Sequence, residues 1–186
     1  MTTGGAHPKM GTHNRLTRTG PDNFLEIIAI DPEQAAPERV RWYRMDDPAV
    51  QVATKAAPKP LSWIVATDDL DAVLATARGL GLDLGVPVQV SRGDLTWRIA
   101  VRDDGDLPEG GTLPVFIQWP EGPHPATRMP DLGLSIAQLI LRHPEPARLD
   151  GWLSALGVRG MVRIEAGEAG IAAEITRADG GSVLID

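Results

Sequence analysis

The sequence predicts an α+β fold in which repeated βαβββ modules form a curled mixed sheet. Residues 61–120 follow the order strand, helix, strand, strand, strand, and residues 121–186 follow that order a second time. Two strand-like segments within residues 5–32 correspond to the end of a further module, which is therefore expected to be N-terminally truncated. An internal repeat of one supersecondary unit of about 50 residues indicates a fold built from copies of that unit.

The truncated first module, residues 5–32, is a predicted hairpin. Residues 12–18 and 24–30 each have the composition of a short strand, and the turn-favouring sequence Gly20-Pro21-Asp22-Asn23 lies between them. The connector that follows, residues 33–60, is rich in proline, alanine and charge. We expect one short helix in this connector, near residues 38–42.

The second module, residues 61–120, opens with a strand at 61–66 and continues with a helical pattern. Asp68 and Asp69 precede that pattern, apolar side chains recur on one face up to residue 77, and Gly79 and Gly81 mark its end. Further strands are predicted at 86–90, 96–101 and 114–119. The acidic residues between 103 and 109 predict a solvated hairpin loop, because a calcium loop needs tighter ligand spacing.

The C-terminal repeat, residues 121–186, is expected to pack on the region formed by residues 1–120. Its predicted elements are a strand at 135–142, a helix at 145–156, and strands at 161–166, 171–177 and 182–185. The division of the chain is thus 1–120 and 121–186.

Composition limits the class of protein. The chain has 186 residues, 42% of them apolar, which is enough to bury a core. There is no apolar run of about 18 residues and no start of signal-peptide type, so we expect no membrane partner and a cytoplasmic location. A net charge of −7 opposes binding to nucleic acid. Because cysteine is absent, any metal must be bound by His, Asp or Glu.

Several segments carry a family resemblance. The main ones are GAHPKMGTHNRL (residues 5–16) and FLEIIAIDP (residues 24–32), with support from residues 61–70, residues 114–119 and GGSVL (residues 180–184). In order and spacing they resemble the glyoxalase-like branch of the vicinal oxygen chelate superfamily. The resemblance implies that the curled sheet forms a half-open cup.

In that family a strand and a helix precede the hairpin, and they would need about 20 to 25 residues. Residues 1–3 cannot supply them. Three explanations are open: a misassigned start codon, a true truncation whose gap the C-terminal repeat fills, and completion by a partner subunit. A homodimer is compatible with the last, since an open sheet edge is normally paired or covered.

The resemblance also implies where a metal would bind. In the superfamily a divalent metal is held in the cup by His and Glu on the first and last strands of each module. Here the first His falls in the missing segment, Glu26 matches the closing acid, and Ser62 and Gln118 occupy the two positions of the second module. Ser and Gln are poor ligands. We therefore expect no cofactor, and a divalent metal only where further ligands are supplied.

Glu26 is the candidate catalytic residue. Apolar neighbours predict its burial, which would raise its pKa and suit it to proton transfer; the alternative is an exposed ion pair with Arg15. The hairpin register decides which side chains join it. A loop with an even number of residues places His13 and Arg15 on its face, and an odd loop brings Asn14. All three are candidate ligand-binding residues.

Trp63, Trp97 and Trp119 are candidates to line the cup, with packing between sheet and helix as the alternative for each. Gln118 is a further candidate contact. His7, His124 and His143 each precede a proline, and we interpret them as structural or solvent-facing.

These observations predict a protein that binds a small organic molecule in an aromatic-lined cup. Whether it is also an enzyme stays open, because binders and enzymes share this fold. One alternative is a metal-dependent isomerase, lyase or dioxygenase of the same superfamily. The other is a non-catalytic structural or regulatory subunit.

Overall fold

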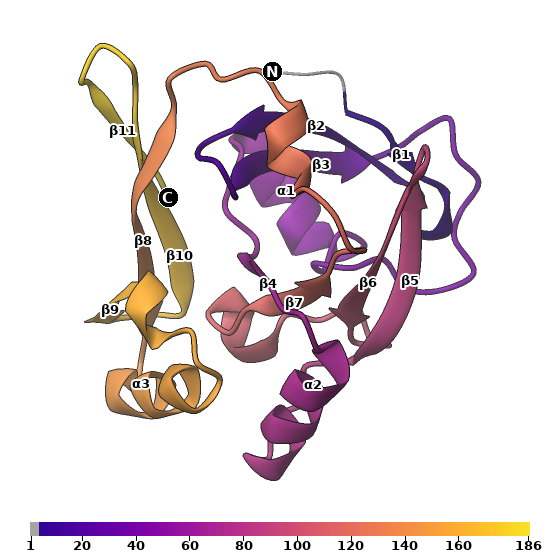
Figure 1. Ribbon diagram of the computed structural model, residues 1–186. Helices are drawn as coiled ribbons and strands as arrows, with labels where there is room; N and C mark the ends of the chain where they lie inside the picture. Colours follow the sequence, from indigo (N-terminus) through magenta and orange to yellow (C-terminus); the bar gives the residue numbers. More distant parts are fainter. Residues whose placement is uncertain (1–3) are drawn as a thin grey trace.

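The structure is a computed structural model in which residues 4–186 are described (Figure 1). This part of the chain contains three sheets and three α-helices, which confirms the predicted α+β class. The helices are α1 (Pro48–Ala56), α2 (Leu70–Gly79) and α3 (Pro146–Ala155). Within residues 4–186, none of the helices has the length and apolar character needed to cross a membrane.

The N-terminal sheet confirms the predicted hairpin and adds a strand to it. Strands β2 (Thr12–Arg18) and β3 (Phe24–Ile30) are antiparallel, with Leu16 opposite Glu26, and residues 19–23 join them. A two-residue strand, β1 (Ala6–His7), pairs with β2 after a tight turn that Gly11 closes at φ 58°. The sequence did not predict β1, because two residues are too few to show a strand pattern.

The connector contains a helix, but not where the sequence predicted it. Helix α1 begins at Pro48, and the side chain of Asp47 caps it by accepting a 2.8 Å hydrogen bond from the backbone N–H of Ala49. An Asp followed by Pro is a strong helix start. The prediction of a helix near residues 38–42 was wrong: this stretch leads into a turn in which Tyr43 and Arg44 have positive φ.

The second module forms the sheet predicted for it. Its strands are β4 (Ile64–Ala66), β5 (Val86–Arg92), β6 (Leu95–Val101) and β7 (Val115–Gln118), in the spatial order β4-β7-β6-β5. The opening strand β4 pairs in parallel with the closing strand β7, and the other pairs are antiparallel.

The C-terminal repeat has the same order of elements along the chain but a different order of strands in space. Its strands are β8 (Ser135–His143), β9 (Arg163–Ala166), β10 (Gly170–Thr176) and β11 (Ser182–Ile185), in the order β11-β10-β8-β9. Here the opening strand β8 pairs in parallel with the second strand β9. The two modules therefore share the order of elements along the chain, but their strands do not pair in the same order.

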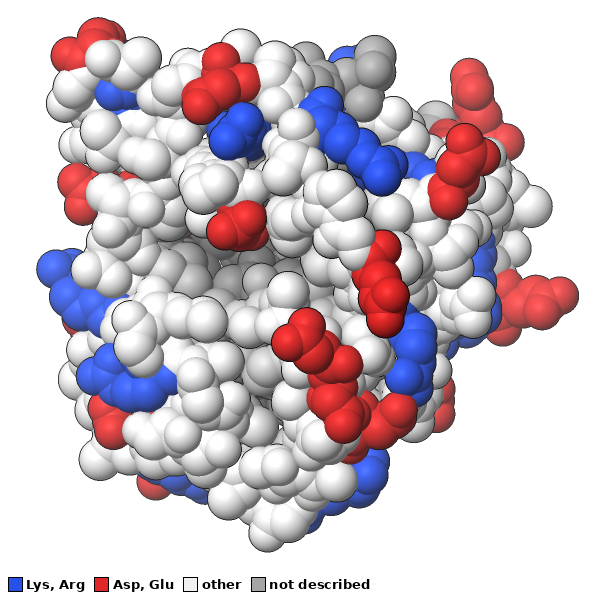
Figure 2. Space-filling model, in the orientation of Figure 1, with Lys and Arg blue, Asp and Glu red and all other residues white. Residues whose placement is uncertain are grey.

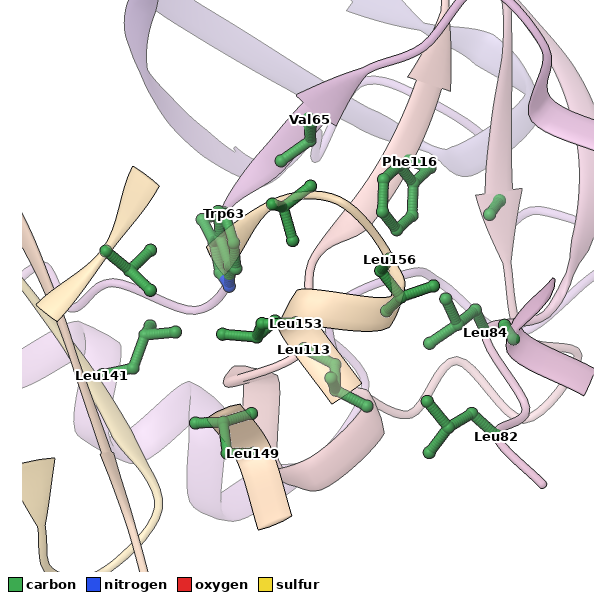
Figure 3. Packing of buried hydrophobic residues seen from close by; sticks show 14 of the residues in the cluster. Trp63, Val65, Leu82, Leu84, Leu113, Phe116, Leu141, Leu149, Leu153 and Leu156 are labelled. Atoms are coloured by element: carbon green, nitrogen blue, oxygen red, sulfur yellow. The ribbon is translucent and has the colours of Figure 1, made fainter. Parts of the chain in front are cut away.

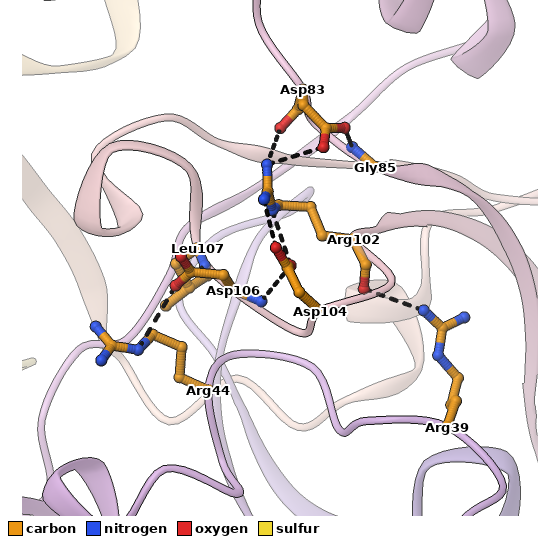
Figure 4. A network of polar contacts seen from close by, with 8 residues as sticks. All are labelled: Arg39, Arg44, Asp83, Gly85, Arg102, Asp104, Asp106 and Leu107. Carbon is orange, nitrogen blue, oxygen red and sulfur yellow. Dashed lines mark hydrogen bonds and ion pairs between the residues drawn. The ribbon is translucent and has the colours of Figure 1, made fainter.

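The acidic loop after β6 is exposed to solvent, as predicted, and ion pairs and hydrogen bonds attach it to neighbouring segments (Figure 4). Arg102 donates from Nε to Asp104 and from Nη1 to Asp83, each at 2.9 Å. Arg39, from the connector, donates to the backbone carbonyl of Arg102 at 3.1 Å. These contacts attach the loop to the connector, although the acidic side chains themselves are largely exposed.

One hydrophobic core joins both halves of the chain (Figure 3). Leu149 and Leu153 of α3 are fully buried, and they belong to the same cluster as Phe116 of β7 and Leu70 of α2. The division at residue 120 stays a prediction, since this core crosses it.

A second cluster lies on the other face of the β4–β7 sheet. Trp97, Ile99 and Ile117 belong to it, together with Trp42 and Tyr43 of the connector. Alternation along β6 and β7 thus sends one set of side chains toward the helices and the other toward the N-terminal hairpin.

Candidate functional site

A cavity of about 780 Å³ lies between the N-terminal hairpin, α1, the β4–β7 sheet and the C-terminal sheet. Figure 2 shows the surface hollowed between the C-terminal sheet and the rest of the molecule. The wall is mainly apolar. Its apolar residues include Ile28, Ile30, Ile99, Ile117, Ile136, Leu139 and Ile171.

Glu26 and Asn14 form the polar end of this cavity. The two lie on one face of the hairpin, because the β2–β3 loop has five residues, 19–23, and that odd number gives the register that brings Asn14 to Glu26. Asn14 Nδ2 donates a 2.7 Å hydrogen bond to Glu26 Oε1. Burial raises the pKa of Glu26, against the opposing effects of this hydrogen bond and of the positive charge of Arg92.

His7, which also lines the cavity, extends this hydrogen-bond network to Thr12. Its Nε2 lies 3.3 Å from Asn14 Nδ2, and its Nδ1 lies 3.1 Å from Thr12 Oγ1. Since an amide nitrogen can only donate, Nε2 must accept and Nδ1 must carry the proton. Burial, followed by the charges of Arg92 and His13, lowers the pKa of His7 to about 4.

Of the two roles interpreted for His7, structural or solvent-facing, the structure excludes the solvent-facing one. His7 is 2% exposed, lines the cavity and contacts the rings of Trp42 and Trp97 edge-on. The sequence feature that could have indicated the burial of His7 is the turn from Pro8 to Gly11, which folds His7 back onto Thr12. His124 also lines the cavity, next to Trp119. His143 is buried away from it, 3.2 Å from Glu109.

The three candidate tryptophans all touch the cavity, in different ways. Trp97 and Trp119 lie on the cavity face, with ring centroids 5.4 Å apart. Trp63 lies mostly in the core with the helices, where its indole N–H donates to the carbonyl of Thr112 at 3.0 Å (Figure 3). Most of the Trp63 side chain therefore packs between the sheet and the helices, which was the alternative to lining the cavity.

Three candidate ligand-binding residues lie outside the cavity wall. His13 and Arg15 are exposed on the opposite face of the hairpin from Glu26, which excludes the alternative of an ion pair between Arg15 and Glu26. Gln118, the last residue of β7, is not part of the cavity wall, whereas its chain neighbours Ile117 and Trp119 are. It accepts from Arg98 at 3.1 Å and donates to the carbonyl of Asp68 at 2.6 Å.

The residues present do not fit the divalent metal that the superfamily implies. Of the matched positions, Glu26 is engaged by Asn14, Ser62 carries only a hydroxyl, and Gln118 faces outward. Within residues 4–186 no three His, Asp or Glu side chains are grouped so that they could hold an ion.

The fold and the cavity together define a protein built of βαβββ modules around a largely apolar cavity. More specifically, the chain belongs to the glyoxalase-like domain family, whose model matches residues 1–157. A search of curated proteins gave no match. A crystal structure of a hypothetical protein from Staphylococcus aureus has a similar fold, with a TM-score of 0.66 and 17% identity over 99% of this chain and 89% of that one.

Proposed function

We propose that this protein binds a small, largely apolar organic molecule in the cavity. The observation that carries the proposal is the cavity itself, because its volume of about 780 Å³ and its apolar wall are typical of small-molecule sites. A few polar groups at one end would orient such a ligand.

Two features support specific roles within the site. Trp97 and Trp119 offer flat apolar surfaces against which a ring or chain can pack. At the polar end, the pKa of Glu26 is raised toward neutral pH, and this shift suits the carboxyl group to proton exchange. Glu26 is therefore the group we propose to exchange a proton with a bound ligand.

Binding is tested with N-phenyl-1-naphthylamine, a neutral apolar dye whose emission rises in apolar surroundings. We expect a saturable rise in emission with the wild-type protein. Trp119→Ala should weaken dye binding about fivefold to tenfold, since it removes one wall of the cavity.

The matched control is Trp152→Ala, because Trp152 lies on α3, outside the cavity wall. This variant should bind the dye like the wild type. Non-saturable emission, or equal losses in both variants, would refute the proposed function.

A further inference from the structure

Arg92 is a partly buried cation in the wall of a mainly apolar cavity. It ends strand β5, is partly buried and lines the cavity. Within residues 4–186 its guanidinium makes no hydrogen bond or ion pair, although its charge acts on Glu26 and His7. A partly buried charge that lacks a paired anion carries a desolvation cost, and a bound anion would offset that cost.

The backbone of Gly5 holds the stem of Arg92 close to the polar end. A Cβ at Gly5 would lie 2.5 Å from Arg92 Cγ, so only glycine leaves room for this stem. Gly5 is itself positioned by Asn14, whose Oδ1 accepts from the Gly5 N–H at 3.0 Å. Asn14 therefore positions both Glu26 and, through Gly5, the arginine.

The charges around the cavity also favour an anion. The basic side chains in its lining are Lys55, Lys59 and Arg92, and the acidic ones are Asp22 and Glu26. This lining is thus positive in a chain whose net charge is −7. Protonation of Glu26, which burial promotes, makes the lining more positive still.

We propose that the cavity takes an apolar monocarboxylate, whose carboxylate pairs with the guanidinium of Arg92 while its apolar part lies against Trp97 and Trp119. The inference rests on the proposed function and adds the chemical class of the ligand. A single guanidinium balances the charge of one carboxylate and can donate two parallel hydrogen bonds to it.

A competing role for Arg92 is to balance the charge of Glu26 without touching any ligand. The two roles differ in one measurable respect. An anchoring Arg92 discriminates a carboxylate from its neutral amide, whereas a balancing Arg92 changes only the ionisation of Glu26.

The test compares 1-naphthylacetate with 1-naphthylacetamide as competitors of N-phenyl-1-naphthylamine at neutral pH. The two compounds have the same ring and differ in charge. We expect the carboxylate to displace the dye from the wild type at a concentration about tenfold or more below that of the amide, as a charge-assisted hydrogen bond predicts. Equal displacement by the two compounds would overturn the inference.

Arg92→Met keeps the apolar stem that packs on Gly5 and removes the charge. In this variant the ratio of the two displacing concentrations should fall to near one while dye binding persists. A ratio that stays at the wild-type value overturns the inference. If Arg92→Met does not fold, Arg92→Gln serves in the same comparison with the same criteria.

Arg78→Gln is the matched control, since Arg78 is exposed near the end of α2 and outside the cavity wall. It removes the same charge and should leave the ratio unchanged, and an equal fall in this variant would assign the preference to overall charge. The outcomes separate the two proposals. Dye binding without a preference for the carboxylate rejects the monocarboxylate and leaves the cavity as a binding site, whereas no dye binding rejects the site itself.

Discussion

The side-chain amide of Asn14 donates a 2.7 Å hydrogen bond to the carboxylate of Glu26. The same amide nitrogen lies 3.3 Å from His7 Nε2, and the amide oxygen accepts from the Gly5 N–H. Asn14 thus fixes an acid, a base and the glycine against which Arg92 packs. The polar end of the cavity is organised around this one side chain.

The first prediction concerns stability and Glu26. Burial raises its pKa above the ordinary value of 4.5, so the folded protein holds this proton more tightly than the unfolded chain does. Its contribution to folding is therefore largest below pH 4.5 and is lost as the pH rises from there through the folded pKa. Glu26→Gln cannot ionise but can still accept from Asn14.

We expect Glu26→Gln to be more stable than the wild type near pH 8, with the advantage shrinking toward pH 4. Urea unfolding across this range measures the difference. A wild-type protein that gains stability over the variant with rising pH would contradict the pKa shift.

The second prediction concerns His7, whose contribution to stability changes with pH in the opposite direction to that of Glu26. Its pKa is lowered from 6.5 to about 4, so its contribution to folding is present above pH 6.5 and is lost as the pH falls toward 4. Ring ¹⁵N spectra at pH 5.5 should show a neutral imidazole with its proton on Nδ1, the nitrogen next to Thr12. A charged ring at that pH, or a proton on Nε2, would refute the network.

Most elements of the fold could be predicted from the sequence because their signals are local. The β2–β3 hairpin and helix α2 follow from turn residues, a capping Asp and apolar spacing. The pairing of β8 with β9 could not be predicted. Two units with the same element order pair their opening strands differently, and the choice of partner strand is made by packing between distant residues.

The site was predictable in part. The odd length of the β2–β3 loop decides between Asn14 and His13, and the sequence left that length open. The sequence predicted Gln118 and Trp119 on one strand, and alternation along that strand already implies that they do not share a face; β7 itself ends at Gln118. Arg92 packs against Gly5 and acts electrostatically on Glu26 and His7, and no local sequence pattern records contacts between residues so far apart in the chain.

The third prediction tests the core that joins the two halves. Leu153 of α3 is fully buried in the shared cluster, and Leu153→Ala should cost about 2–5 kcal/mol in the free energy of unfolding. Leu184→Ala makes the same chemical change at a side chain that is 56% exposed, and should change stability by no more than about 0.5 kcal/mol. Chemical denaturation gives both values; similar costs for the two variants would argue against the buried position of α3.

The last prediction connects the ionisation of Glu26 to ligand binding. Arg92 and Glu26 act on each other electrostatically, so an ionised Glu26 competes with a ligand carboxylate for the same guanidinium. The affinity for 1-naphthylacetate should therefore fall as the pH rises above 4.5 through the raised pKa of Glu26, once the ligand itself is ionised. The neutral amide should show no such fall.

Glu26→Gln removes the competing charge, so it should bind the carboxylate at least as tightly as the wild type and lose the pH dependence. Calorimetric titrations of both proteins over a pH series measure this. If the affinity of the variant for 1-naphthylacetate declined with pH as in the wild type, some other group would be titrating. That result would show that Glu26 does not compete with the ligand for Arg92.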